Sequence, residues 1–357
     1  MRFRATLAPE QVAHLYALVS PLAKVASHSQ AAYHGASTQK SAMSQLSSWT
    51  SNTCLLALDS ERMYFALDLP PTEGMSCVAI VEAKGGIFLE HRIESNAPDN
   101  RIILRVDLVQ FRTALQSIHQ QIQTKSRHSN RGASAQFASA PSTLTVLKLA
   151  KRQGMPCLCL EAKTAFRMEM HQTIPVQVQR PSDWSEGRFG LPNLPAEPTV
   201  QLWLPPTSSA TLKSLLDAVK QPTKGGRQAT HILFTGHGDT SELRLQLQHD
   251  NGAQLQTLFL GQAPDGQQPS SSAATATATV RVNAAHVACT LNHGAWTTEW
   301  SWIPNQALVV AVRLAPVGIC TYVLPVSYLE EDDQEEEDDD DQATMTPINA
   351  SFVSPGS

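Results

Sequence analysis

The residues whose types could support acid–base chemistry are two histidines, an aspartate and an acidic run near the end of the sequence. His237 and Asp239 lie in the segment TGHGDT between two apolar runs, and His293 precedes Gly294. A Gly-rich polar segment between strands is typical of a turn, and a glycine after a helix is typical of a helix end. The run EEDDQEEEDDDD at 330–341 carries eleven carboxylates, but general acid–base catalysis needs carboxyl groups held in a fixed geometry. We therefore expect no catalytic residue.

The cysteines could bind metal or form disulfides, but their spacing argues against both. None of them lies in a C-x-x-C pair, and each lies in an apolar run: Cys54, Cys77, Cys157, Cys159, Cys289 and Cys320. We expect buried, free thiols in a reducing compartment. The sequence also has no Gly-rich phosphate-binding motif and no histidine pair spaced for a metal on one helix face. We therefore expect no cofactor, no metal site and no enzymatic activity.

Basic residues near helical patterns form the other chemically active set. Lys213 and Lys220 are seven residues apart, which places them on one face of a helix, and Lys224 follows. Arg112 and His119 have the same spacing on another helical segment. Lys and Arg side chains that contact phosphates bind nucleic acid without reading its sequence, and this binding depends on salt. The alternative interpretation is ordinary solubilising surface charge.

The charge of the chain is divided unevenly between its body and its end. The formal net charge is −5 at pH 7, and without the eleven carboxylates of 330–341 it becomes about +6. Hydrophobic residues make up 42% of the chain, which is enough for a buried core. No run approaches the roughly 18 apolar residues of a membrane span, and the start MRFRATL lacks the apolar stretch of a signal peptide. We expect a soluble protein inside the cell with no membrane partner.

Short apolar runs predict a protein made mainly of strands, with a few helices. Pro9 begins a helical stripe that includes Leu15 and Val19, and Asp107 can cap a second helix with Phe111 and Leu115 inward. The predicted helices are 9–23, 107–123, 207–220 and 283–293. The predicted strands are 3–7, 54–59, 63–69, 77–83, 87–93, 102–106, 144–150, 157–162, 166–170, 174–178, 308–314 and 319–326.

This pattern occurs twice along the chain. A shift of about 197 residues places Pro9 and its helical stripe over Pro206 and a second stripe. A shift of about 176 residues places RVDLVQFRTAL over RVNAAHVACTL, with Asp107 over Asn283 as the helix cap. A length of 357 residues also favours two domains over one. We therefore expect two copies of one strand-and-helix module.

Low apolar content, prolines and glycines mark the boundaries between these parts. We expect poorly ordered insertions and a disordered acidic tail. The predicted parts are domain one at 1–179 with insertions at about 27–52 and 124–142, a connector at 180–198, domain two at 199–328 with an insertion at about 262–278, and the acidic tail at 329–357.

An ordered series of segments resembles one protein family. The series comprises MRFRATL, CLLALDSERMYFAL, IILRVDLVQFRTALQS, LTVLKLAKRQGMPCLCLEA, HQTIPVQVQRPSDW, VQLWLPPTSSATLKSLLDAVK and the final YVLPV. Together these segments resemble the hydroxyurea-sensitivity subunit of the heterotrimeric DNA-damage checkpoint clamp, a relative of proliferating cell nuclear antigen. The resemblance covers nearly all of 1–326 apart from the insertions. It implies an α+β class and the DNA clamp fold, with two similar domains that each have antiparallel sheets and two helices.

The resemblance also implies partners and sites. It implies a ring with two other clamp-type subunits of the RAD type, loading onto double-stranded DNA by a clamp loader, and a nuclear location with the cytoplasm as an alternative. The ring would serve as a platform for checkpoint signalling and repair factors at damage sites. The connector residues Trp184 and Phe189 would dock partners, although Trp184 is equally suited to fill a core. The residues expected to face DNA are Lys24, Arg112, Lys213, Lys220 and Lys224.

Two other functions stay open at this point. A homotrimeric replication clamp would share the fold, and an acidic-tailed scaffold would make no contact with DNA. Residues 9–23 contain no Lys or Arg, so a helix there would add spacing rather than attraction if it faced DNA. The acidic tail could also compete with DNA for a basic surface.

Overall fold

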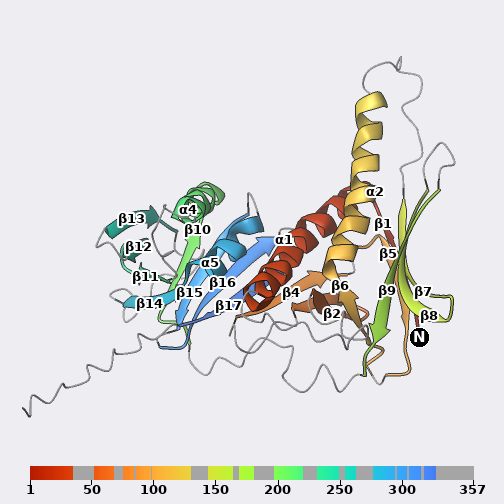
Figure 1. The fold of residues 1–357 in the computed structure, drawn as a ribbon, viewed down its shortest axis with the longest axis horizontal. Coiled ribbons are helices and arrows are strands. Elements are labelled where there is room, and N and C mark those ends of the chain that lie inside the picture. Colours follow the sequence, from red (N-terminus) through yellow and green to blue (C-terminus); the bar gives the residue numbers. More distant parts are fainter. Residues whose placement is uncertain are drawn as a thin grey trace, which may run out of the picture. The chain divides into compact units, whose positions relative to one another are not determined.

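The computed structural model of the protein is shown in Figure 1. Residues Met1–Ser327 form one compact unit. Within it the structure describes residues 1–34, 52–67, 75–83, 86–97, 99–129, 144–163, 169–180, 197–219, 231–248, 254–262, 276–293, 296–303, 305–314 and 317–326.

Helices and strands alternate along the chain in two similar series. The helices are α1 (Pro9–His34), α2 (Leu108–Ser129), α4 (Pro206–Val219) and α5 (Ala284–Thr290), and α5 continues into a 3₁₀ turn, η3 (Leu291–His293). The strands of the first half are β1 (Arg2–Leu7), β2 (Thr53–Leu58), β3 (Arg62–Leu67), β4 (Ser76–Glu82), β5 (Glu90–Glu94), β6 (Ile102–Asp107), β7 (Thr145–Arg152), β8 (Met155–Lys163) and β9 (Glu169–Val178). The strands of the second half are β10 (Val200–Leu204), β11 (His231–His237), β12 (Glu242–Gln248), β13 (Gln254–Leu260), β14 (Thr277–Asn283), β15 (Thr298–Ile303), β16 (Ala307–Leu314) and β17 (Gly318–Pro325).

The described strands form two antiparallel sheets. One has 13 strands in the order β10-β15-β16-β17-β4-β3-β2-β6-β9-β8-β7-β1-β5, and the other has four in the order β13-β12-β11-β14. The ladder between β17 and β4 joins the two halves, with Cys320 opposite Ala79 and Tyr322 opposite Cys77. This combination of antiparallel sheets and four helices is the α+β architecture that the sequence predicts.

The predicted repeat is present in the order of the elements. Each half runs strand, helix, three strands, strand, helix, three strands, and β5 is the additional strand of the first half. Pro9 and Pro206 each begin the first helix of a half. Asp107 Oδ1 accepts hydrogen bonds from the N–H groups of the second and third residues after it, and Asn283 Oδ1 accepts one from Ala285 N at 2.8 Å. Both predicted caps are therefore confirmed, whereas the domain boundary at 180–198 stays a prediction.

The helices cover the core with the apolar stripes that the spacing predicts. Val12, Leu15 and Val19 of α1 and Phe111 and Leu115 of α2 are completely buried. Burial of each such side chain contributes roughly 1.5–3 kcal/mol relative to exposure. The six cysteines are also buried and free, as expected. Among the described helices none is long and apolar enough to cross a membrane.

Both long helices extend into segments that the sequence predicts as insertions, so the predicted helix ends at 23 and 123 are too early. Helix α1 continues to His34 and α2 to Ser129. Their low apolar content suggested surface excursions, but Ala, Gln, Lys and Arg are good helix formers whether or not they are buried. The third insertion, predicted at about 262–278, lies between Gln262, which forms a bridge with Trp203, and β14, which begins at Thr277.

Two strand predictions need correction. The segments 166–170 and 174–178 were expected as separate strands, whereas Glu169–Val178 is one continuous strand paired with β8. Pro175 does not interrupt it, because a strand can hold a proline wherever the missing N–H is not needed for the ladder. The strand expected at 87–93 begins only at Glu90, since Ile87 and Phe88 lie in a buried turn. The remaining parts of the insertions, the connector with Trp184 and Phe189, and the acidic tail lie outside the described residues.

Candidate nucleic-acid interface

The four helices form one layer that crosses the junction between the two halves. Helix α1 packs against α2 on one side and against α5 on the other, and α5 packs against α4. In Figure 1 they follow one another across the view in the order α4, α5, α1, α2. The buried stripes of these helices face the sheets, so their other faces form a surface made of helices alone.

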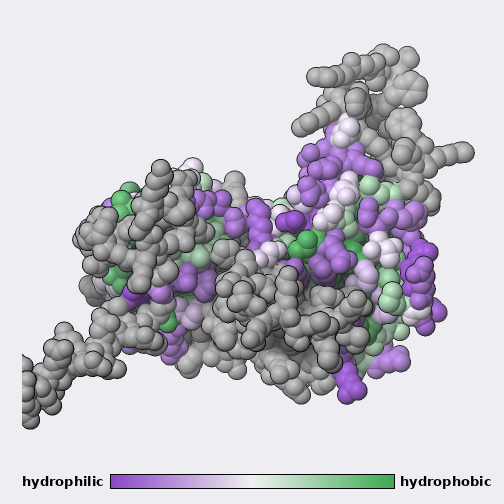
Figure 2. Space-filling view, viewed as in Figure 1, coloured by the Kyte–Doolittle hydropathy of each residue, from purple (hydrophilic) through white to green (hydrophobic). Residues whose placement is uncertain are grey.

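This helical surface is polar but carries few charges. On α2 the exposed positions are Gln110, Thr113, Gln120, Gln123 and Thr124, and Figure 2 shows hydrophilic residues over the outer part of this helix. On α4 the exposed positions are Thr207, Ala210, Thr211, Ser214, Asp217 and Ala218. Hydroxyl and amide groups of this kind can donate to phosphates without contributing net charge.

Arg112 lies on the flank of α2 that faces α1. It is half-buried, and its Nε is buried with no hydrogen-bond partner among the described residues. His119, seven residues later on the same flank, stacks on Tyr16 of α1 with ring centroids 5.5 Å apart. A buried donor without a partner is costly, and an anion can satisfy it. Arg112 therefore lies on the helical layer with its Nε enclosed, and its contact with DNA stays a prediction.

The other predicted cations are not gathered around Arg112. Lys24 is exposed on α1, where the residues on both sides of it are buried. Lys213 on α4 pairs with Asp217 at 3.3 Å, four residues later in the same helix. This exposed ion pair reduces the attraction that Lys213 would offer to a phosphate. Lys220 and Lys224 lie outside the described residues.

The stacked pair of Tyr16 and His119 was not predicted as part of a site. His119 Nε2 lies 2.8 Å from Gln123 Nε2, and His119 Nδ1 is buried without a hydrogen-bond partner in the described part of the chain. The sequence placed His119 on the face of Arg112, but no spacing rule links it to a residue about one hundred positions away. Only the packing of α1 on α2 brings them together.

The two histidine segments considered for catalysis have structural positions. The segment after His237 is the turn between β11 and β12, and His237 Nδ1 lies 3.2 Å from Thr277 Oγ1 on the neighbouring strand β14. His293 is the last residue of the 3₁₀ turn that ends α5. Within the described ranges no group of three His, Cys, Asp or Glu side chains could hold a metal ion.

The strand edges form a second feature that the sequence analysis did not identify. The first six residues of β17, Gly318–Val323, pair with β4. By the repeat, β9 corresponds to β17 and β13 corresponds to β4. In β9 only Val176–Val178 pair with β6, so that side of residues 169–175 has no ladder with any described strand. The outer edge of β13 is likewise unpaired in the part of the chain that the structure describes.

Exposed leucines mark the open edge of β13. Leu258 and Leu260 are 48% and 66% exposed and lie two residues apart, on one face of the strand, and Leu255 is 38% exposed. An open edge with apolar side chains is a template for pairing with another chain. In the equivalent ladder between β4 and β17, burial raises the pKa of the Cys77 thiol and of the Tyr322 hydroxyl well above their usual ranges. A ladder of this kind can therefore be deeply buried once it is complete.

Comparison with known proteins agrees with this geometry. The model of the family described as Hus1-like protein matches residues 30–327. Among solved structures, the PCNA2–PCNA3 complex from Sulfolobus tokodaii is similar with a TM-score of 0.52 and 13% identity, covering 90% of this chain and 98% of that chain. Proliferating Cellular Nuclear Antigen from Entamoeba histolytica is similar with a TM-score of 0.57 and 8% identity, covering 91% and 99%.

No curated protein sequence matches the chain. The structural similarity establishes the PCNA-like clamp fold, and the family match extends over most of the chain. With its duplicated halves, shared helical layer and sheet continuous across the junction, the chain belongs to the Hus1-like family and has the fold of a sliding-clamp subunit.

Proposed function

We propose that this protein is one subunit of a heterotrimeric checkpoint clamp that encircles double-stranded DNA at damage sites and serves as a platform for checkpoint and repair factors. Membership of the Hus1-like family and the PCNA-like fold support the class of clamp subunit. The observation that carries the proposal is the ladder between β4 and β17, because its two equivalents in the repeat are open edges at β13 and β9.

The open edges explain how a ring would form. Within the chain, β4 is the last of the three strands β2, β3 and β4 of the first half, and it pairs with β17, the last strand of the second half. The equivalent of β4 in the second half is β13, and the equivalent of β17 in the first half is β9. If the same pairing is used between chains, β13 pairs with the strand of one neighbour that is equivalent to β9. In the same way, β9 pairs with the strand of the other neighbour that is equivalent to β13. A heterologous contact of this kind closes into a ring when its rotation closes.

The helical layer is the surface that would face DNA in such a ring. Its hydroxyl and amide groups, together with Arg112 and Lys24, suit contacts to the phosphate backbone and contain no element that reads bases. Because Lys213 is paired with Asp217, the attraction would be weak. Weak contacts that are independent of sequence suit a protein that slides. Lys220 and Lys224 stay proposed contacts of the same type, and Trp184 and Phe189 stay proposed docking residues of the connector.

An assembly experiment tests how many subunits the ring has and which proteins they are. Both β9 and β13 lie on this one chain, so a homotrimer is the competing assembly. Native mass spectrometry of the purified chain should give a monomer, and copurification from cells should recover two other clamp-type subunits in a 1:1:1 ring and a clamp loader. A stable trimer of this chain alone would replace the checkpoint ring by a homotrimeric clamp. A nuclear location, tested by imaging of the tagged chain, belongs to the same proposal.

A further inference from the structure

Strand β5 is a sheet edge that ring formation does not use. It is the last strand of the 13-stranded sheet, and among the described strands only β1 pairs with it. The proposed ring-forming strand β9 lies at the other end of the run β9-β8-β7-β1-β5. In the second half, β10 is the equivalent of β1, and on the edge of β10 that does not pair with β15 the described residues form only the bridge between Trp203 and Gln262. The edge of β5 is therefore specific to the first half, and it can accept a strand from another protein.

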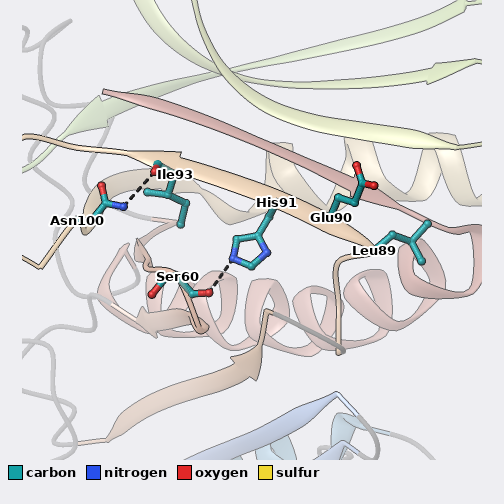
Figure 3. Close-up of a pocket in the computed structure, with 6 residues that line it drawn as sticks. All are labelled: Ser60, Leu89, Glu90, His91, Ile93 and Asn100. Atoms are coloured by element: carbon teal, nitrogen blue, oxygen red, sulfur yellow. Dashed lines mark hydrogen bonds between the residues drawn. The ribbon is translucent and has the colours of Figure 1, made fainter.

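A pocket of about 540 Å³ opens beside this edge, between β5 and the turn that joins β2 to β3. His91 reaches across it, and its Nε2 lies 2.9 Å from the carbonyl oxygen of Ser60 (Figure 3). Leu89 at one end of the pocket is 54% exposed. The residues that line the pocket are Ser60, Leu89, Glu90, His91, Ile93 and Asn100. The pocket has ample room for an apolar side chain and offers both apolar and polar contacts.

The opposite face of β5 carries alternating charges. Glu90, Arg92 and Glu94 lie two residues apart, so their side chains share one face, and Figure 3 shows the Glu90 carboxylate pointing away from His91. Arg92 is 81% exposed and pairs with Glu94. In the described part of the chain Glu90 has no ion-pair partner. Among the described residues, the outer face of the edge therefore presents Glu90 without an ion-pair partner, next to the exposed Arg92, which pairs with Glu94.

The row of side chains that begins at Arg92 adds to this pattern. Arg92 lies directly opposite Arg4 of β1, and Arg4 lies directly opposite Lys148 of β7. Like charges directly opposite each other across strands are destabilising. Lys148 has a partner in Glu161 at 2.8 Å, but Arg4 has no ion pair with any residue that the structure describes. A carboxylate added opposite Arg92 would offset the repulsion at the open end of this row.

We propose that the edge of β5 binds an extended segment of a partner protein in which a basic residue and an acidic residue flank one apolar residue. The segment pairs its backbone with β5. Its acidic side chain lies opposite Arg92, its basic side chain opposite Glu90, and the apolar side chain between them enters the pocket beside His91. Successive side chains of a strand alternate between faces, so one tripeptide supplies all three contacts.

The test uses fluorescein-labelled peptides of eleven residues with a Thr- and Ser-rich context and the full chain. One peptide has a central Asp-Val-Lys and the other a central Lys-Val-Asp. The direction of the added strand decides which order fits, and we expect that order to bind about tenfold more tightly, as measured by fluorescence anisotropy. In the double variant E90K/R92E the preference should reverse, and in R92A the difference between the peptides should shrink. Equal binding of the two peptides, or no binding of either, overturns the proposal.

Two controls separate strand addition from simple charge attraction. N-methylation of the better peptide removes backbone donors and keeps every side chain, so it should abolish binding. The variant E299R/R313E exchanges the charges of an ion pair on β15 and β16 in the second half of the chain, and it should leave the affinity of both peptides unchanged. Binding of the N-methylated peptide as tight as that of its parent, or an unchanged preference in E90K/R92E, contradicts the inference. Neither outcome bears on ring assembly, since the experiment uses the chain without partners.

Discussion

The sulfur atoms of Cys77 and Cys320 lie 3.7 Å apart across the ladder that joins β4 to β17. Both thiols are completely or almost completely buried. They come from residues 243 positions apart in sequence, so their contact depends on the ladder alone. The same ladder is the only direct strand pairing between the two halves among the described residues. The state of these thiols therefore reports whether the junction between the halves is closed.

Burial should make Cys77 unreactive in the folded protein. Burial raises the pKa of its thiol well above the usual range, and the neighbouring Cys320 thiol raises it further. Since the thiolate is the reactive form, iodoacetamide at pH 8 should leave Cys77 unlabelled in the native chain and label it in guanidinium, as read by peptide mass spectrometry. The raised pKa also means that this group stabilises the fold below about pH 8.5 and that the stabilisation is lost at higher pH. Rapid native labelling would show that the junction opens.

The ion pair of Glu161 should give the fold an acid-sensitive component. Lys148, whose Nζ lies 2.8 Å from Glu161, lowers the pKa of this carboxyl, and His171 lowers it further. The stabilisation is present above about pH 4.3 and is lost as the pH falls through the folded-state pKa. We expect E161Q to lower the free energy of unfolding in urea by about 0.5–1 kcal/mol at pH 7, with the difference shrinking as the pH falls through the folded-state pKa. The exposed Glu82, changed in E82Q, should show almost no effect at either pH.

Local features of this fold could be predicted from local sequence. The caps at Asp107 and Asn283 and the stripes of α1 and α2 depend only on residue types and short spacings, and the structure confirms them. The ion pair between Lys213 and Asp217 was also visible as an i, i+4 spacing.

Features that depend on tertiary pairing could not be predicted in this way. The open edges of β9 and β13 follow from which strands pair, and alternating apolar patterns do not name a partner strand. The stacking of His119 on Tyr16 and the pocket beside β5 likewise need residues about one hundred and about thirty positions apart to meet. The ends of α1 and α2 were misplaced because polar residues with good helix propensity resemble loop residues in composition.

Arg112 should contribute more to DNA binding than Lys213. Among the described residues Arg112 forms no ion pair, whereas Lys213 is paired with Asp217. In the assembled ring, R112E should weaken binding to duplex DNA and reduce the salt slope by about 0.9 for each phosphate contact that is lost. K213A should change little, and D217N should strengthen binding because it frees Lys213. The exposed Arg62 on β3 provides the control R62E, and equal losses for R62E and R112E would contradict a specific role of the helical layer.

The open edge of β13 should be required for assembly. Lysine on an edge strand opposes pairing with another strand, so L258K/L260K should prevent copurification of one partner subunit while the chain itself stays folded by circular dichroism. The matched control is L144K, since Leu144 is a leucine of similar exposure next to β7. Size-exclusion chromatography of coexpressed subunits reads the result. An intact ring with L258K/L260K would show that β13 is not an interface.

Topological retention on DNA tests the central claim most directly. The assembled ring is loaded onto a nicked circular plasmid by its clamp loader, washed in high salt to remove electrostatic contacts, and the plasmid is then cut once. A ring that encircles DNA should stay on the circle through the wash and leave within minutes of linearisation. Release by salt before cutting, or retention on linear DNA with free ends, would contradict the account of this chain as part of an encircling clamp.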